Sequence, residues 1–198
     1  MTVRKTTLTA IAAIALGVAS LPLSSNALAA TSTKGLVPLS VQGVGPGGMS
    51  VSTTCQFGST TLDCPGSDSC LCITGTDTLV GNQGFAKGTL GFGMIFDTTA
   101  AASILPASTF GDCAAGTGVG LITNSNGKQS LSINISGLAC PTATSDVDIF
   151  NGTYVVVNGT GKYSSSSGGT GALNGTVDGT TSFSQTAVNG SVMATLPQ

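Results

Sequence analysis

The six cysteines are the residues whose spacing most directly predicts chemistry. They are Cys55, Cys64, Cys70, Cys72, Cys113 and Cys140. Zinc binding is the first alternative for the four that cluster. However, their spacings contain no Cys-x-x-Cys pair and the chain has no histidine, so the sequence predicts no metal site. An even number of cysteines in an exported chain favours disulfides instead.

The clustered cysteines are expected to form two nested disulfides. Cys64 and Cys70 flank the turn-forming pair Pro65-Gly66, which predicts a bridge across a tight hairpin. Cys55 and Cys72 would then join the flanking strands. Cys70 cannot easily pair with Cys72, because a one-residue loop strains disulfide geometry. Four cysteines allow three connectivities, so a bridge from Cys55 to Cys64 stays open as an alternative.

A hairpin predicts the third disulfide. Asn126-Gly127 is a preferred two-residue hairpin turn, because both of its central positions need positive φ. It lies between two predicted strands, residues 118–123 and 129–136. Under such a turn, residues whose numbers sum to 126 + 127 = 253 face each other. Cys113 and Cys140 satisfy this sum, so we expect them to be bonded at the open end of the hairpin.

Acid, base and nucleophilic catalysis finds little support in the sequence. The chain contains no histidine and no glutamate, which excludes a Ser-His-Asp triad. Lys162 beside Tyr163 and Ser164 lies in a Gly/Ser-rich stretch, where a solvated lysine is expected. Asp146 and Asp148 stand at a strand entrance, where aspartates usually form turns and guard edges. We therefore predict no catalytic residue, no metal ligand and no cofactor, and a non-enzymatic role is favoured.

Residues 1–29 have the organisation of a bacterial secretory signal peptide. Arg4 and Lys5 form the positive region, residues 8–21 the apolar region, and Ala27-Leu28-Ala29 the cleavage site. The apolar region is shorter than the roughly 20 residues of a membrane span. We therefore predict cleavage after Ala29, no membrane span in the mature chain, and a secreted, periplasmic or cell-surface location.

The remaining chain is acidic and poor in charge. Removing Arg4 and Lys5 leaves four lysines against eight aspartates, a formal charge of 4 − 8 = −4. A chain without a basic stripe is an improbable partner for nucleic acid. Solubility then rests on the hydroxyl and amide side chains of Ser, Thr and Asn.

Short strands separated by glycine-rich turns predict an all-β protein. Leu90, Phe92, Met94 and Phe96 fall on alternate positions, separated by two glycines and Ile95, which is typical of a strand with one buried face. We expect no long helix. Residues 30–48 are rich in Gly, Pro and Ser and are expected to be a loose N-terminal arm or an edge strand. Residues 49–198 should form a single domain.

A repeated unit near the C-terminus points to the architecture. Two apolar residues, Asn-Gly, a hydroxyl residue and a β-former recur at residues 149–154, 172–177 and 187–192. The units start 23 and then 15 residues apart, which favours a meander over the fixed period of a β-solenoid. Many short strands with glycine bends fit a small antiparallel barrel, with a β-sandwich as the alternative.

Residues 148–180 also carry a family resemblance. Its motifs are Phe150-x-Gly152-x-Tyr154-Val155-Val156-Val157, Gly159-Thr160-Gly161-Lys162-Tyr163 and Gly169-x-Gly171-x-Leu173-x-Gly175-Thr176. This region resembles the glycine-threonine-glycine segment of allene oxide cyclase and dirigent-like barrels, including exported bacterial proteins of unassigned role. The resemblance implies an eight-stranded antiparallel barrel with an apolar interior. It does not imply cyclase activity, because the catalytic glutamate has no counterpart here.

Three functional hypotheses follow. In the first, the barrel binds an apolar small molecule or serves at the cell surface without catalysis. A cavity for that molecule would be lined by Phe92, Met94, Phe96, Ile133 and Tyr154. In the second, it is a dirigent or cyclase-type enzyme that works without histidine. In the third, it is a structural or adhesive surface protein whose Ser/Thr/Asn-rich face contacts carbohydrate. A cavity with an inward aspartate would favour the first two, and a filled core with a polar face the third.

Overall fold

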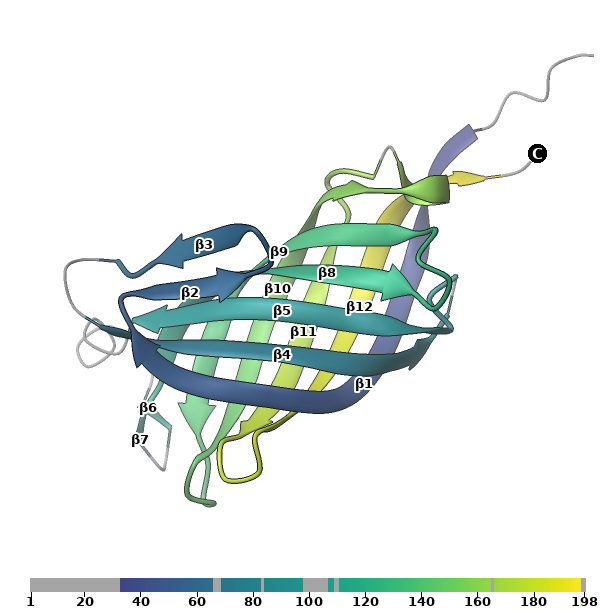
Figure 1. The fold of residues 1–198 in the computed structure, drawn as a ribbon. Coiled ribbons are helices and arrows are strands. Elements are labelled where there is room, and N and C mark those ends of the chain that lie inside the picture. Colours follow the sequence, from purple (N-terminus) through teal and green to yellow (C-terminus); the bar gives the residue numbers. More distant parts are fainter. Residues whose placement is uncertain are drawn as a thin grey trace, which may run out of the picture. The chain divides into compact units, whose positions relative to one another are not determined.

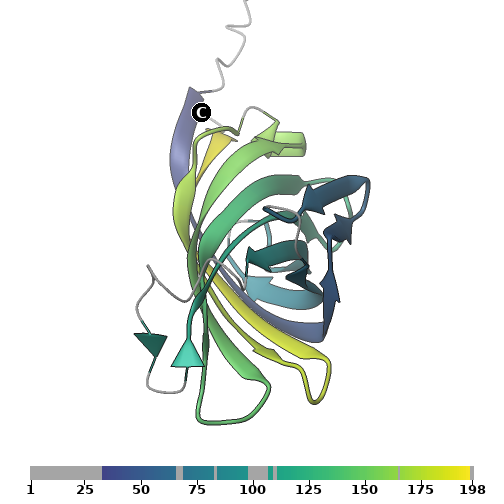
Figure 2. The same cartoon turned by 90° about the vertical axis from the view of Figure 1, so that its left-hand side faces the viewer.

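A closed antiparallel barrel of eight strands forms the body of the protein (Figures 1 and 2). The computed structural model describes residues 33–65, 69–82, 84–97, 107–108, 111–164 and 166–196. The strands follow one another around the wall in the order β1-β12-β11-β10-β9-β8-β5-β4. Their bounds are β1 Thr33–Ser52, β4 Cys70–Gly81, β5 Lys87–Asp97, β8 Ala114–Asn124, β9 Ser130–Pro141, β10 Val147–Gly159, β11 Thr170–Asp178 and β12 Phe183–Leu196. The all-β barrel prediction is confirmed, and the sandwich alternative is not realised.

Shorter elements lie outside this order. They are β2 (Thr54–Phe57), β3 (Thr60–Asp63), β6 (Ala107–Ser108), β7 (Gly111–Asp112) and the 3-10 helix η2 (Gly161–Tyr163). β2 pairs with β3, and β6 pairs with β7. The predicted signal peptide, residues 1–29, and its cleavage site lie outside the described residues.

Strand β1 differs from the loose arm or edge strand expected for residues 30–48. It is a 20-residue strand that pairs with β12 from Thr33 to Pro46 and with β4 from Val41 to Ser52. It therefore closes the barrel. Its glycines suggested a loop, but they permit close approach instead: a Cβ at Gly45 would collide with the carbonyl group of Thr76 on β4. The barrel domain accordingly includes most of the segment assigned to the arm.

The β8–β9 hairpin has the predicted register with a different turn. The pairs Ala114↔Ala139 and Thr123↔Ser130 both sum to 253. The backbone N–H of Asn124 donates to the carbonyl oxygen of Gln129 (3.0 Å), so four residues, 125–128, form the loop. Of the two predicted turn residues, only Gly127 has positive φ (70°). A symmetric loop of four keeps the same register as a loop of two.

The barrel interior is filled by large side chains that lie over glycines of neighbouring strands. Phe92 faces Gly75 across β4–β5, and Phe96 faces Gly116 across β5–β8. A Cβ at either glycine would collide with the facing ring. The glycines therefore create the space that the aromatic rings occupy, which is how a narrow barrel reaches interior packing density. Other fully buried residues of this core include Leu39, Ile73, Leu90, Ile122, Leu131 and Val188.

A second, smaller core lies outside the wall. The β2–β3 hairpin stands against the outer face of β4 and β5 in both views (Figures 1 and 2). Beneath it, Ile95 is only 3% exposed and groups with buried cysteines. Phe57 of β2 lies on Gly91 and Gly93 of β5, where a Cβ at Gly93 would come within 2.7 Å of the Cβ of Phe57. The hairpin therefore shields an apolar patch of wall from water.

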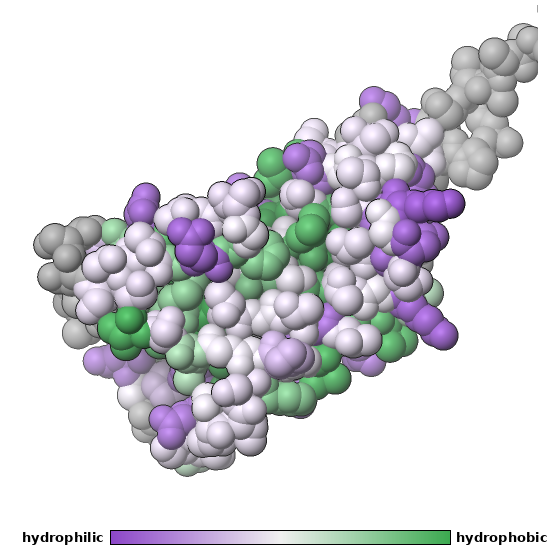
Figure 3. Space-filling model, viewed as in Figure 1, coloured by the Kyte–Doolittle hydropathy of each residue, from purple (hydrophilic) through white to green (hydrophobic). Residues whose placement is uncertain are grey.

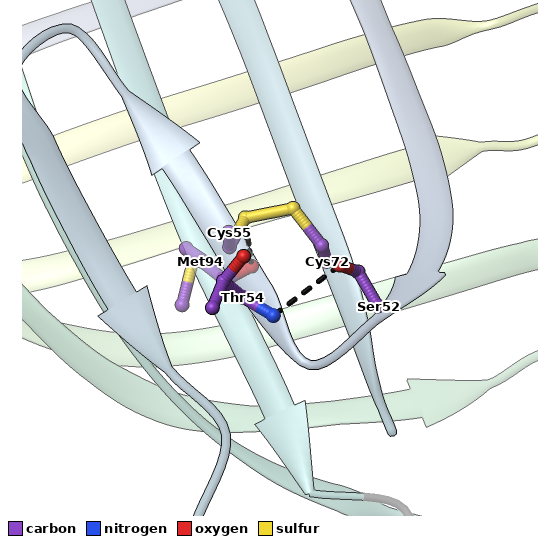
Figure 4. The surroundings of a disulfide bond; sticks show 5 residues. All are labelled: Ser52, Thr54, Cys55, Cys72 and Met94. Atoms are coloured by element: carbon purple, nitrogen blue, oxygen red, sulfur yellow. Dashed lines mark hydrogen bonds between the residues drawn. A yellow bond between two sulfur atoms is a disulfide. The ribbon is translucent and has the colours of Figure 1, made fainter.

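Two disulfides attach the outer β2–β3 hairpin to the barrel, and a third joins two strands of the wall. Cys55–Cys72 joins β2 to β4, and the Cys55 sulfur lies 3.3 Å from the carbonyl oxygen of Met94 (Figure 4). Cys64–Cys70 closes the segment between β3 and β4, of which residues 66–68 are not described. Cys113–Cys140 joins the start of β8 to the end of β9. These are the three pairings predicted from the sequence.

Candidate binding groove on the barrel wall

The barrel interior has almost no free volume. Its cavity measures about 20 Å³, roughly the space for one water molecule. Phe92, Met94 and Phe96 line it, whereas Ile133 and Tyr154 are buried in the core but do not border it. Ligand pockets usually measure roughly 300–1,000 Å³. The residues predicted to line a ligand cavity therefore fill the barrel in this structure.

A buried carboxyl group on β4 lies beside this cavity and is hydrogen-bonded to β12. Asp77 of β4 points inward and is fully buried. The hydroxyl groups of Ser184 and Thr186, both on β12, donate to its two oxygens over 2.5 Å and 2.7 Å. Burial raises the pKa of Asp77, and the two hydrogen bonds act in the opposite direction. The network links β4 to β12 across β1, and sequence analysis did not identify it.

The aspartates predicted to sit at a strand entrance are separated by the start of β10. Asp146 precedes the strand with a φ of 61° and is exposed. Asp148 is half-buried and borders the interior cavity. Burial raises the pKa of Asp148, with a smaller contribution from the negative charge of Asp146. No group of three or more metal-ligating residues occurs in the described part of the chain.

The Lys162-Tyr163-Ser164 cluster packs against one end of the barrel. Tyr163 is fully buried in η2, and its ring stacks on Phe85 with 5.0 Å between centroids. The Lys162 Nζ lies 4.9 Å from the centroid of the Tyr163 ring. The Tyr163 ring therefore packs against the end of the barrel, with the lysine ammonium above it. Tyr154 is buried nearer the middle of the wall, where its hydroxyl donates to the Ser191 carbonyl oxygen (3.2 Å) and burial raises its pKa to about 12.

A groove with a volume of about 580 Å³ lies on the outside of the wall. It runs across five neighbouring strands, β10, β11, β12, β1 and β4. One side, which we call the first row, consists of residues in direct register: Ile149, Thr176, Gln185, Val44 and Thr78. The second row lies two residues along each strand and consists of Asn151, Asn174, Ala187, Gln42 and Val80, of which Asn151 alone is not in the groove lining.

The floor of the groove is the backbone between these rows. Gly43, Gly175 and Thr186 contribute to it. The Thr186 side chain points inward to Asp77, so the buried network lies directly beneath the floor. Alternate residues of a strand face opposite sides of the wall. The same strands can therefore carry groove side chains on the outside and the Asp77 network on the inside. The network thus holds the three strands β12, β1 and β4 that carry most of the groove.

The chemistry of the groove is polar and uncharged. None of the described residues that line it carries a charge. Gln42, Asn174 and Gln185 supply amides that both donate and accept hydrogen bonds, and Thr78 and Thr176 supply hydroxyls. Val44, Val80 and Ile149 are 44%, 62% and 44% exposed and add apolar surface. A second hollow of about 420 Å³ adjoins the second row and adds Ser40, Asn82 and Asn189.

Figure 3 views the side of the barrel that carries the β2–β3 hairpin. On this side, strongly hydrophilic residues and hydrophobic patches are scattered over a mostly pale surface.

Comparison of the chain with protein-family models, with curated proteins and with solved structures finds no match. Among the described residues, no helix has the length and apolarity to cross a membrane. The groove geometry is therefore the main guide to function.

Proposed function

We propose that the protein is a non-enzymatic binding protein that takes a neutral carbohydrate in the groove on its barrel wall. The observation that carries this proposal is the uncharged groove lined by amides, hydroxyls and exposed aliphatic side chains. A sugar ring offers hydroxyls at its edge and C–H groups on its faces, so it pairs with both kinds of lining residue. The interior cavity of about 20 Å³ gives no comparable support to an apolar ligand inside the barrel.

Other ligand classes fit the groove less well. Nucleic acid and anionic polymers need cationic side chains, which the lining lacks. A peptide that binds by strand addition needs a free sheet edge, and in the closed barrel each strand has a neighbour on both sides. The three disulfides are consistent with an oxidising, extracellular environment. A cell-surface or secreted saccharide-binding role agrees with the predicted export signal. Membership of the allene oxide cyclase-like barrels stays a prediction.

Depletion from solution by insoluble polysaccharides tests this proposal. The purified protein is mixed with cellulose, chitin and starch, with a polyuronate gel as the charged comparison, and the protein left in solution is measured. We expect binding to at least one neutral polymer. Replacing Gln42, Asn174 and Gln185 together by Ala should weaken it at least tenfold, because each lost hydrogen bond is worth about 1 kcal/mol.

The matched control is Asn134→Ala. Asn134 is an exposed asparagine on β9, opposite Val119 and Val155 and outside the groove. This variant should bind like the wild type. Equal loss in both variants would show that the groove is not the site, and failure to bind any neutral saccharide would reject the proposed function.

A further inference from the structure

The direction of the groove relative to the strands restricts the shape of its ligand. Each row consists of residues in direct register on five consecutive strands, so the groove follows the inter-strand hydrogen-bond direction. Neighbouring strands lie about 4.8 Å apart, so the row spans about 19 Å from β10 to β4. The two rows are about 6.7 Å apart along each strand. The groove is therefore long and about one sugar ring wide.

Polar side chains change sides from strand to strand along the groove. On β12 the polar residue is Gln185 in the first row, facing Ala187 in the second. On β1 the order reverses, with Val44 in the first row and Gln42 in the second. On β4 it reverses again.

The β4 pair is Thr78 in the first row and Val80 in the second. At the other end, Ile149 of β10 is apolar in the first row and its second-row neighbour Asn151 is polar. Only β11 is polar on both sides, through Thr176 and Asn174. Four of the five strands therefore present one polar and one apolar side chain, and the polar side alternates over three consecutive strands.

An extended chain of β-linked pyranoses has the same alternation. Each ring is turned over by about half a turn relative to the preceding one, so equivalent hydroxyls point to opposite edges of the ribbon in turn. One ring advances the chain by a distance close to the strand spacing of about 4.8 Å. A compact or helical saccharide has neither property.

Resting on the proposed carbohydrate function, we infer that the ligand is a linear, neutral, β-1,4-linked polysaccharide lying across the strands with about one sugar per strand. Over β11, β12, β1 and β4 its ring edges receive hydrogen bonds alternately from the two rows, and on β10 it meets the apolar Ile149 in the first row. Its C–H faces contact the exposed aliphatic side chains of Val44, Val80 and Ile149. The five strands from β10 to β4 form five consecutive subsites.

Titration calorimetry with a length series tests this arrangement. The probes are cello-oligosaccharides from the disaccharide to the hexasaccharide, with malto-oligosaccharides of equal length as the α-linked comparison. We expect affinity to rise with each added β-linked unit and to level off at about five units, one for each strand. The α-linked series should bind at least tenfold more weakly at the longest lengths.

A swap variant tests the alternation itself. Gln42→Val combined with Val44→Gln keeps the composition of β1 and moves the amide to the other row. Affinity for the pentasaccharide should fall at least tenfold while the melting temperature stays unchanged. The matched control is Thr117→Val with Val119→Thr, an outward pair on β8 away from the groove, which should have no effect. Thr78→Val with Val80→Thr repeats the test on β4 if the first variant is unstable.

The outcomes separate this inference from the proposed function. Equal affinity for the disaccharide and the pentasaccharide, stronger binding of the α-linked series, or an unaffected swap variant would overturn the linear arrangement while leaving carbohydrate binding intact. A further outcome is binding of neutral polysaccharide through Gln42, Asn174 and Gln185 without any rise of affinity along the length series. That result, too, would overturn the linear arrangement and leave carbohydrate binding intact. Absence of binding to every saccharide would reject both.

Discussion

The outer wall of this barrel has two faces, one covered by the β2–β3 hairpin and one exposed at the groove. Over β4 and β5 the outward positions include Cys72, Gly91, Gly93 and Ile95, and the β2–β3 hairpin covers them. From β10 through β12 to β1, the outward positions that line the groove are amides, hydroxyls and scattered aliphatic residues, and no described element covers them. The residue types on each face thus correspond to what lies on it: protein in one case and solvent, or a ligand, in the other.

Each face is also stabilised in a different way. The covering hairpin is short and has a small core, so two disulfides attach it to the wall. None of the described residues that line the groove takes part in a disulfide, and the two bonded cysteines of β4, Cys70 and Cys72, lie at the other end of that strand. Its strands are joined from inside by hydrogen bonds from Ser184 and Thr186 to Asp77. Crosslinks therefore secure the cover, and a buried polar network secures the binding surface.

The largest local effect should come from removing the bridge of the covered face. Cys55→Ser with Cys72→Ser releases a loop of 17 residues in sequence separation, which corresponds to roughly 3 kcal/mol of unfolding free energy in the chain-entropy model. We expect faster amide hydrogen exchange in β2 and β3, because only Cys64–Cys70 and a small apolar core then hold the hairpin. Exchange in β11 and β12 and saccharide binding should be unaffected. Loss of protection in those strands would show that the faces are not independent.

The matched comparison is Cys113→Ser with Cys140→Ser. This disulfide joins two strands of the wall, with a sequence separation of 27. Its loss should lower the free energy of unfolding by roughly 3 to 4 kcal/mol. Here the whole barrel should melt at lower temperature, with unchanged β-sheet circular dichroism in the cold. A double variant that melts with the wild type under non-reducing conditions would contradict the assigned pairing.

An intermediate effect is expected beneath the groove. Asp77→Ala leaves the buried hydroxyls of Ser184 and Thr186 without their acceptor, which should cost about 1 to 3 kcal/mol. Because Thr186 belongs to the groove floor, saccharide affinity should fall as well. The control is Asp63→Ala, an exposed aspartate on the covering hairpin, with an expected change within about 0.5 kcal/mol. Chemical denaturation and calorimetry measure both quantities, and equal stability of the two variants would refute the role of the network.

Sequence reasoning predicted the covered side better than the groove side. Cysteine spacing and turn chemistry are local signals, and they led to the observed pairing of all six cysteines. The Asn126-Gly127 turn gave the correct register although the loop has four residues, since a symmetric loop preserves the sum of paired numbers. For residues 30–48 a loose arm and an edge strand both stayed open, and pairing on both sides was not predicted, because the glycines and prolines are as typical of loops as of a sharply bent strand.

The groove could not be found from the sequence. Its rows combine residues from β10, β11, β12, β1 and β4, and recognising them requires the register of four separate strand pairs. Asp77 did leave a local signal: it alternates with outward residues between Gly75 and Leu79 and therefore points inward. Its partners Ser184 and Thr186 are more than 100 residues away in sequence, so no local pattern connects them.

The smallest expected effect, a dependence of stability on pH, separates the two faces once more. Burial raises the pKa of Asp77 above its ordinary value of 3.8, so the folded state holds this proton more firmly than the unfolded state. Stability is then fully present below about pH 4 and declines as pH rises through the raised pKa, with a slope of at most about 1.4 kcal/mol per pH unit for one proton. Asp148, whose pKa is also raised, contributes in the same direction.

The variant Asp77→Asn should remove the larger part of this decline while keeping the fold, because the serine and threonine hydroxyls can reorient toward an amide. Thermal melts between about pH 4 and pH 8 measure it. Asp178 does not interfere, since hydrogen bonds from Thr180 lower its pKa and its contribution is lost only on acidification below that range. Among the described residues of the small core under the β2–β3 hairpin there is no carboxyl, lysine or tyrosine side chain, so Cys55→Ser with Cys72→Ser should retain the wild-type slope. A slope that persists in Asp77→Asn would place the titrating group elsewhere and would remove the link between the buried carboxylate and the groove face.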